Sequence, residues 1–182
     1  MTTPSKSLRA AVLLAALALP GALDAQHADH PAAAGTLPAI PASLREEHQE
    51  IHARLEAATG APGATGRAAR ELAAVLHPHF VREEQIALPP LGLLAPLAQG
   101  RYTPEMRRVL PMTDSLRAEL PRMLEEHVAI RAATARLADA ARAEGHAEAA
   151  QLAAALALHA RSEEELFYPA AVLVGDLVRA HP

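Results

Sequence analysis

Apolar residues recur every three or four positions along most of this chain, and glycine and proline divide the pattern into four long segments. This spacing places apolar side chains on one face of an α-helix and differs from the alternation of a half-buried strand. The pattern predicts helices over residues 42–58, 66–87, 113–143 and 147–168. We therefore expect an all-α fold, an antiparallel, up-and-down four-helix bundle.

Residues that start, bend or end helices set the expected boundaries. Ser43 is a candidate N-cap for the first helix, and Gly145 is a candidate C-cap for the third. Pro78 and Pro121 fall inside the second and third helices, where proline removes a hydrogen bond and bends the axis. The stretch 91–102 has no clear period, so we expect an irregular connection there.

Histidine and glutamate interrupt the apolar face at matching places in the two halves of the chain. The segment EEHQEI at 46–51 recurs as EEHVAI at 125–130, and HFVREE at 79–84 recurs as HARSEE at 159–164. On the fourth helix the predicted buried face ends at Leu166. The polar residues that fall on the predicted buried face are His48, His79, Glu83, His127, His159 and Glu163.

Four imidazoles and two carboxylates on a buried face indicate a metal site. An unpaired buried carboxylate is costly, and a bound cation favours ionised glutamate together with neutral histidine. Glu83 follows His79 by four residues, which stacks the two side chains one turn apart. The same spacing separates His159 from Glu163. Such a carboxylate can reach the ion that its histidine binds and bridge to a second ion, although a metal-free buried polar network is the alternative.

A fifth histidine distinguishes the first half from the second. His52 lies one turn after His48 at the edge of the same face, and its counterpart in the second half is Arg131. We treat His52 as a candidate ligand, with a solvated position or a place behind the ligands as the alternative. The acidic pairs at 46–47 and 125–126 are expected mainly in solvent, or else orienting the neighbouring imidazoles.

The first 25 residues have the composition of a secretory signal peptide. Two basic residues precede the apolar run 10–19, and small residues follow it. We expect cleavage after Ala25, a flexible lead-in over 26–41 and a folded domain over 42–178, with an uncleaved anchor as the alternative. The apolar run is short for a membrane span and no second one follows, so we expect no stable span after cleavage and export to the periplasm or the medium.

Composition excludes several classes of partner and cofactor. The sequence contains no cysteine, which excludes disulfides, thiolate metal sites and covalently attached haem. The net charge is −4 and no basic block is present, which argues against a nucleic acid as partner.

The combined motif resembles the hemerythrin-like, HHE cation-binding domain. The matching pieces are EEHQEIH, HFVREEQIALPP, EEHVAIR and HARSEEELFYP, which together cover about residues 42–170. The resemblance implies two non-haem irons, with the four histidines of the motif as terminal ligands and with Glu83 and Glu163 as bridges. Oxygen-carrying hemerythrins have a pair of histidines four residues apart on the third helix, where this chain has Arg131; here the pair is His48 and His52.

Three metal-binding hypotheses for function follow from these patterns, and a purely structural helical bundle without metal is the fourth alternative. The first is an exported protein whose di-iron site binds dioxygen, peroxide or nitric oxide, or handles iron. The second is an enzyme, a di-iron peroxidase or a protein that repairs oxidative or nitrosative damage. The third is a zinc- or copper-binding helical bundle of the cell envelope, because these ions bind such donors more tightly than ferrous iron does.

Overall fold

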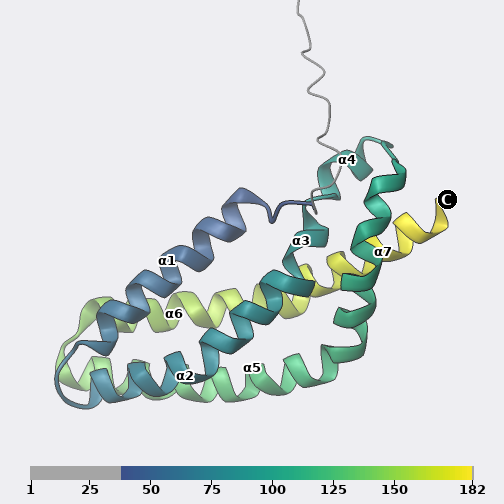
Figure 1. Cartoon of the computed structure of the whole chain (residues 1–182). Coiled ribbons are helices and arrows are strands. Elements are labelled where there is room, and N and C mark those ends of the chain that lie inside the picture. Colours follow the sequence, from purple (N-terminus) through teal and green to yellow (C-terminus); the bar gives the residue numbers. More distant parts are fainter. Residues whose placement is uncertain (1–37, 182) are drawn as a thin grey trace, which may run out of the picture. The chain divides into compact units, whose positions relative to one another are not determined.

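The computed structural model describes residues 38–181, and every regular element within them is helical. The long helices in Figure 1 are α1 (Ala42–Thr59), α2 (Gly63–Ile86), α5 (Leu110–Glu144) and α6 (Ala147–Ser162). The predicted signal peptide and most of the predicted lead-in lie outside the described residues. Within the described part of the chain, none of the helices combines the length and the apolar character needed to cross a membrane.

The four long helices enclose one apolar interior. α1 packs against α2, α2 against α5, α5 against α6, and α6 against α1. Leucines from three of these helices, among them Leu72, Leu137 and Leu156, are almost completely buried in this interior. Burial of such a side chain stabilises the fold by about 1.5–3 kcal/mol, so the apolar face identified in the sequence holds the helices together.

The ends of the helices agree only partly with the sequence predictions. Ser43 is not a cap, because the carbonyl of Pro41 already accepts hydrogen bonds from the backbone N–H groups of Leu44 and Arg45, so the helix has begun before Ser43. Gly145 ends α5 in the left-handed conformation, with φ of 75°, as predicted for a C-cap glycine. Both helices with an internal proline, α2 and α5, continue through it.

A carboxylate from another helix caps the N-terminus of α2. Glu144, the last residue of α5, accepts hydrogen bonds from the backbone N–H groups of Ala64 (2.7 Å) and Thr65 (2.9 Å) and from the Thr65 hydroxyl (2.7 Å). These bonds lower the pKa of Glu144 to about 2. The chain turns into α2 at Gly63, whose φ is 71°, and a side chain there would overlap the Glu144 carboxylate. Glu144 therefore ties the start of α2 to the end of α5.

The connection between α2 and α5 is more regular than predicted. It contains the short helices α3 (Leu88–Leu91) and α4 (Leu94–Ala98) and a 3₁₀ helix, η1 (Pro104–Val109). The expectation of an irregular stretch over 91–102 was therefore wrong for α4. These elements pack against the C-terminal helix α7 (Tyr168–Ala180) through buried leucines and valines, and this tertiary packing stabilises turns too short to show a period in the sequence.

A π-helical segment interrupts what the sequence predicts as one helix over 147–168. This segment, η2 (Glu163–Phe167), joins α6 to α7, and the backbone N–H of Tyr168 donates to the carbonyl of Glu163, five residues earlier. The wider turn shifts the buried face. Leu166 is therefore 62% exposed instead of buried, and Tyr168 faces the interior. The prediction for Leu166 was wrong because it assumed an unbroken α-helical period.

Candidate metal centre

All four long helices contribute to a cluster of buried polar side chains. α1 and α5 each contribute one histidine, α2 contributes a histidine and a glutamate, α6 contributes a histidine, and η2 contributes a glutamate. Each of the six side chains is at most 3% exposed. The structure brings together these six residues of the repeated motif: His48, His79, Glu83, His127, His159 and Glu163.

Their donor atoms fall into two groups that share both glutamates. One group is formed by His48 and His159 with the two glutamates, and the other by His79 and His127 with the same two glutamates. Within each group the donor atoms all lie within 4.8 Å of one another. We call these groups the His48/His159 position and the His79/His127 position.

Each glutamate directs one carboxylate oxygen to each position. Glu83 Oε1 lies 3.4 Å from His79 Nε2, whereas Glu83 Oε2 lies 3.9 Å from His48 Nε2. Glu163 Oε2 lies 3.4 Å from His127 Nε2, whereas Glu163 Oε1 lies 2.8 Å from His159 Nε2. A carboxylate placed in this way can bridge two metal ions, one at each position.

The His48/His159 position contains buried polar atoms that no hydrogen bond satisfies. Within residues 38–181, His48 Nε2, His159 Nε2, Glu83 Oε2 and Glu163 Oε1 have no hydrogen-bond partner, since the 2.8 Å contact between His159 and Glu163 is misaligned. Such an atom costs about 1–3 kcal/mol when buried. All four atoms would be satisfied by one cation. Imidazole and carboxylate donors suit iron, manganese and zinc, so the residues fit a metal site.

At the His79/His127 position a hydroxyl group joins the cluster. His79 Nε2 and His127 Nε2 lie 2.8 Å apart. The hydroxyl of Tyr168 donates a hydrogen bond to Glu83 Oε1 and lies 3.2 Å from His127 Nε2 and 3.4 Å from His79 Nε2. Burial and the charges of Glu83 and Glu163 raise the pKa of Tyr168, so the hydroxyl is neutral in the metal-free protein.

Burial and mutual contacts shift the pKa values of the residues in the cluster. Burial and the nearby Glu163 raise the pKa of Glu83. Burial opposes the ionisation of Glu163 too, but its contacts with His127 and His159 outweigh this effect and hold its pKa well below the ordinary value. Burial lowers the pKa of His79, yet Glu83 and Glu126 raise it to about 9. Protons on imidazoles thus balance carboxylate charge in the metal-free protein, and a bound cation would replace them.

A second layer of carboxylates surrounds the histidines. In each case the Nδ1 atom faces a glutamate from a different helical segment, at 2.8 to 3.2 Å. A carboxylate that accepts the Nδ1 proton leaves Nε2 free to bind a metal and fixes the orientation of the ring. Hydrogen bonds join His48 with Glu84, His79 with Glu126, and His127 with Glu164. His159 Nδ1 lies 3.2 Å from Glu47 but has no hydrogen-bond partner within residues 38–181.

The sequence predictions identified these outer glutamates only in part. Glu47 and Glu126 belong to acidic pairs expected mainly in solvent, with orientation of an imidazole as the alternative. The structure favours that alternative for Glu126, which is hydrogen-bonded to His79, whereas Glu47 is 45% exposed and only lies near His159. No role was predicted for Glu84 and Glu164, because each falls off the apolar face of its own helix. The recurrence of a doubled glutamate in every copy of the motif is the signal that points to them.

The outer carboxylates differ between the two positions. Around the His79/His127 position, Glu126 and Glu164 are 28% exposed and are held by Arg122 and Arg131. Burial raises the pKa of both glutamates, but hydrogen bonds from these arginines and from the histidines outweigh it and lower the pKa below its ordinary value. Around the His48/His159 position the two glutamates are 44–45% exposed and have no arginine partner within the described residues. The His79/His127 position is therefore the more rigidly supported of the two.

His52, the candidate fifth ligand, belongs to neither group. Its partly exposed ring packs edge-on against Phe80, with ring centroids 5.2 Å apart, and lies 5.6 Å from the ring of the exposed His77. Burial and the neighbouring His77 lower its pKa. Phe80 also stacks on His48 at 4.0 Å. This places His52 behind the ligand groups, which was the alternative considered from the sequence.

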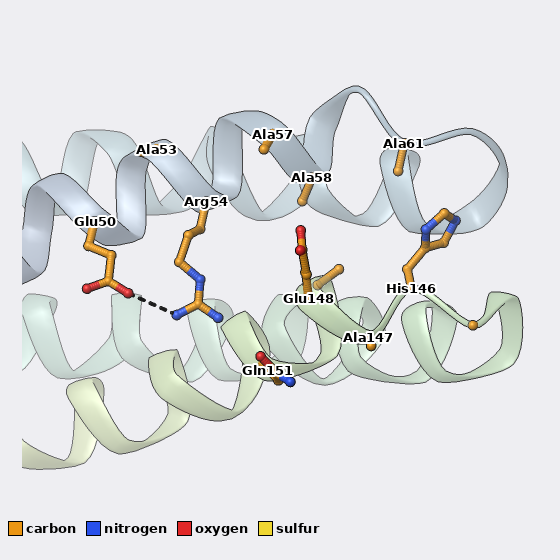
Figure 2. A pocket seen from close by; sticks show the side chains of 12 residues that line it. Glu50, Ala53, Arg54, Ala57, Ala58, Ala61, His146, Ala147, Glu148 and Gln151 are labelled. Carbon is orange, nitrogen blue, oxygen red and sulfur yellow. Dashed lines mark hydrogen bonds and ion pairs between the residues drawn. The ribbon is translucent and has the colours of Figure 1, made fainter. Parts of the chain in front are cut away.

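A pocket between α1 and α6 is separate from the cluster. Figure 2 shows that Glu50 and Arg54 of α1 form an ion pair at its edge, and that Glu148 and Gln151 approach from α6. Alanine side chains line much of the rest, and none of the six cluster residues contributes to it.

The fold and the cluster define a helical protein with a buried histidine and glutamate site that can bind metal cations. The model of the hemerythrin HHE cation-binding domain family matches residues 39–171. The chain therefore belongs to this family, as the sequence motif predicted. Searches of curated proteins and of solved structures found no match.

Proposed function

We propose that the domain holds two non-haem iron ions in an antiparallel, up-and-down four-helix bundle formed by α1, α2, α5 and α6. The observation that carries this proposal is that Glu83 and Glu163 each direct one oxygen to either pair of histidines. The four histidines would be terminal ligands and the two glutamates would be bridges. The ring of contacts between the four helices supports the bundle arrangement.

Iron bound here would supply redox-active ions with coordination positions that the protein leaves open. Each position contains two imidazoles and two carboxylate oxygens, whereas an octahedral ion takes six donors. We propose that dioxygen, peroxide or nitric oxide binds in this space. The protein contributes buried surroundings that exclude water, and outer carboxylates that hold the imidazoles of His79 and His127 with Nε2 directed inward.

We further propose that the domain works outside the cytoplasm. Support comes from the sequence alone, in which basic residues precede a short apolar run at the N-terminus. Mass spectrometry of the protein purified from the cell envelope or the medium would give the mature N-terminus. We expect it to follow Ala25, and a chain that keeps residues 1–25 would contradict cleavage.

The proposal is tested by adding small ligands to the iron-loaded protein. The protein would be reconstituted with ferrous iron without air, then titrated with nitric oxide, peroxide or dioxygen while the visible spectrum is recorded. We expect a stoichiometric spectral change with at least one ligand, and its loss in Glu163→Gln. Glu165→Gln is the matched control, because Glu165 is exposed two residues further along the same segment.

The alternatives give different results in the same preparation. Repeated turnover of peroxide or nitric oxide instead of stoichiometric binding would favour the enzyme hypothesis. Zinc or copper instead of iron in protein isolated from its native compartment would favour the hypothesis of a zinc- or copper-binding bundle. No spectral change with any of the three ligands, in protein shown to contain iron, would contradict small-ligand binding.

A further inference from the structure

The π-helical segment brings one residue other than the six motif histidines and glutamates into the cluster. Tyr168 follows η2 directly and is only 1% exposed. The N–H of its backbone is bonded to the carbonyl of Glu163, so the position of the tyrosine is linked to that of a proposed bridging ligand. The aromatic ring therefore reaches the centre because η2 departs from the α-helical period.

The hydroxyl oxygen of Tyr168 lies at the spacing expected for a ligand. Two donor atoms bound side by side to one octahedral ion, at about 2.1 Å each, are about 3 Å apart. The hydroxyl oxygen is 3.2 Å from His127 Nε2 and 3.4 Å from His79 Nε2, and it bonds to Glu83 Oε1. Its three neighbours are thus the donor atoms of one metal position.

Among residues 38–181, no hydroxyl group takes a corresponding place at the His48/His159 position. Within the described part of the chain, the Nε2 atoms of His48 and His159 have no hydrogen-bond partner. The aromatic side chain that packs on His48 is Phe80, which offers no donor atom. The inner ligand set is therefore symmetric only in its histidines and glutamates, and the tyrosine oxygen distinguishes the two positions.

We propose that Tyr168 is an additional protein ligand of the ion held by His79 and His127, bound through its phenol oxygen. This inference rests on the proposed function. On ligation the oxygen exchanges its bond to hydrogen for a bond to the ferric ion, the proton passes to solvent, and no electron is transferred. The His79/His127 ion then has one open position fewer than its neighbour, which directs an external small ligand to the His48/His159 side.

The test uses the spectrum of the iron-loaded protein. A phenolate bound to ferric iron gives a visible charge-transfer band whose resonance Raman spectrum contains tyrosine ring vibrations. The full chain would be loaded with ferrous iron, oxidised in air and measured alongside its iron content. We expect the band in the wild type, its loss in Tyr168→Phe with the iron retained, and a shift of the ring vibrations after incorporation of ring-deuterated tyrosine.

The second tyrosine of the chain provides a matched control. Tyr102, the only other tyrosine in the sequence, is partly exposed and stacks on His181. Tyr102→Phe should keep the band at full intensity. Two irons per chain without tyrosine vibrations, or a band that survives in Tyr168→Phe, would overturn the ligation by Tyr168 alone. A wild-type chain that binds no iron would overturn the proposed function, and the role of Tyr168 with it.

If Tyr168→Phe folds poorly, the isotope shift in the wild type and in Tyr102→Phe still tests the ligation. Tyr102 is the only other tyrosine in the sequence, so ring vibrations that shift in both proteins belong to Tyr168.

Discussion

The Nε2 atoms of His79 and His127 face each other at 2.8 Å in the interior of the protein. Such a contact needs a proton on one of the two nitrogens. The Nδ1 atoms of both rings also face carboxylates, those of Glu126 and Glu164, which favour a proton on each Nδ1. The contact between the two Nε2 atoms therefore requires one of the rings to be a buried imidazolium, and a cation between the rings would replace its Nε2 proton. Since this cation would bind only the folded protein, metal binding should stabilise the fold.

The first prediction concerns thermal stability. A ligand at about 100 times its Kd stabilises the folded state by about 2.7 kcal/mol, which for a domain of this size raises Tm by roughly 5–10 °C. We expect a shift of this order between chelator-treated and metal-loaded protein in a calorimetric scan. His79→Ala should lose most of the shift, whereas the exposed His77→Ala should keep it. Equal Tm values with and without metal in the wild type would contradict a buried metal site.

The second prediction concerns the outer carboxylates. Glu126 accepts a hydrogen bond from His79 Nδ1 at 2.9 Å and is held by Arg122. Loss of such a partner typically weakens metal binding by about 10–100-fold. Glu126→Gln should therefore lower the metal affinity measured by competition with a chelator, while the number of ions bound at saturation stays the same. Glu125→Gln, at the exposed neighbouring position, should bind like the wild type, and equal affinities for both variants would exclude a role for the outer layer.

The third prediction concerns pH and the cap between α5 and α2. The hydrogen bonds from Ala64 and Thr65 lower the pKa of Glu144 from 4.5 to about 2. A carboxyl group with a depressed pKa in the folded state stabilises the fold above its unfolded pKa, and this stabilisation is lost as the pH falls through the folded pKa. Glu144→Gln should therefore be less stable than the wild type near neutral pH. The difference should shrink between about pH 4.5 and pH 2.

This difference would be measured by urea unfolding of metal-free protein over the pH range in which it stays folded, so that loss of metal does not contribute. Glu56→Gln, on the exposed face of α1, is the control and should show no such trend. A difference between Glu144→Gln and the wild type that does not change with pH would contradict the cap.

The fourth prediction concerns the contact between α7 and α5. A Cβ atom at Gly175 would overlap the side chain of Thr113. Gly175→Ala should destabilise the protein by about 1–3 kcal/mol, the usual cost of an overpacked core, even though alanine favours the helix by about 1 kcal/mol. Gly60→Ala is the control, because a Cβ there meets only a backbone oxygen at 3.5 Å. Denaturant unfolding would compare the two, and equal stability would contradict the close packing.

The six cluster residues could be chosen from the sequence because their signal is local and repeated. The spacing of His79 from Glu83 recurs at His159 and Glu163, and both pairs fall on an apolar face that a helical period identifies. The pairing of His48 with His159, and of His79 with His127, depends on which helices are neighbours, and the sequence does not contain that information in any local pattern.

The remaining features depend on backbone geometry or on contacts between helices. Tyr168 is buried and Leu166 is exposed because η2 has a π-helical turn. No residue type in the segment indicates such a turn. Glu84 and Glu164 lie off the buried face of their own segments and reach histidines on neighbouring helices. His52 has the right spacing on α1 but packs against Phe80, a contact between helices that periodicity cannot reveal.

The number of metal ions bound per chain tests the central claim most directly, since the two positions are defined by the glutamates that they share. Elemental analysis of the iron-loaded protein, after removal of free metal by gel filtration, should give about two ions per chain for the wild type. It should give fewer for Glu83→Gln, because that substitution removes a carboxylate from both positions. A saturated wild-type chain that holds one ion or none would contradict the account.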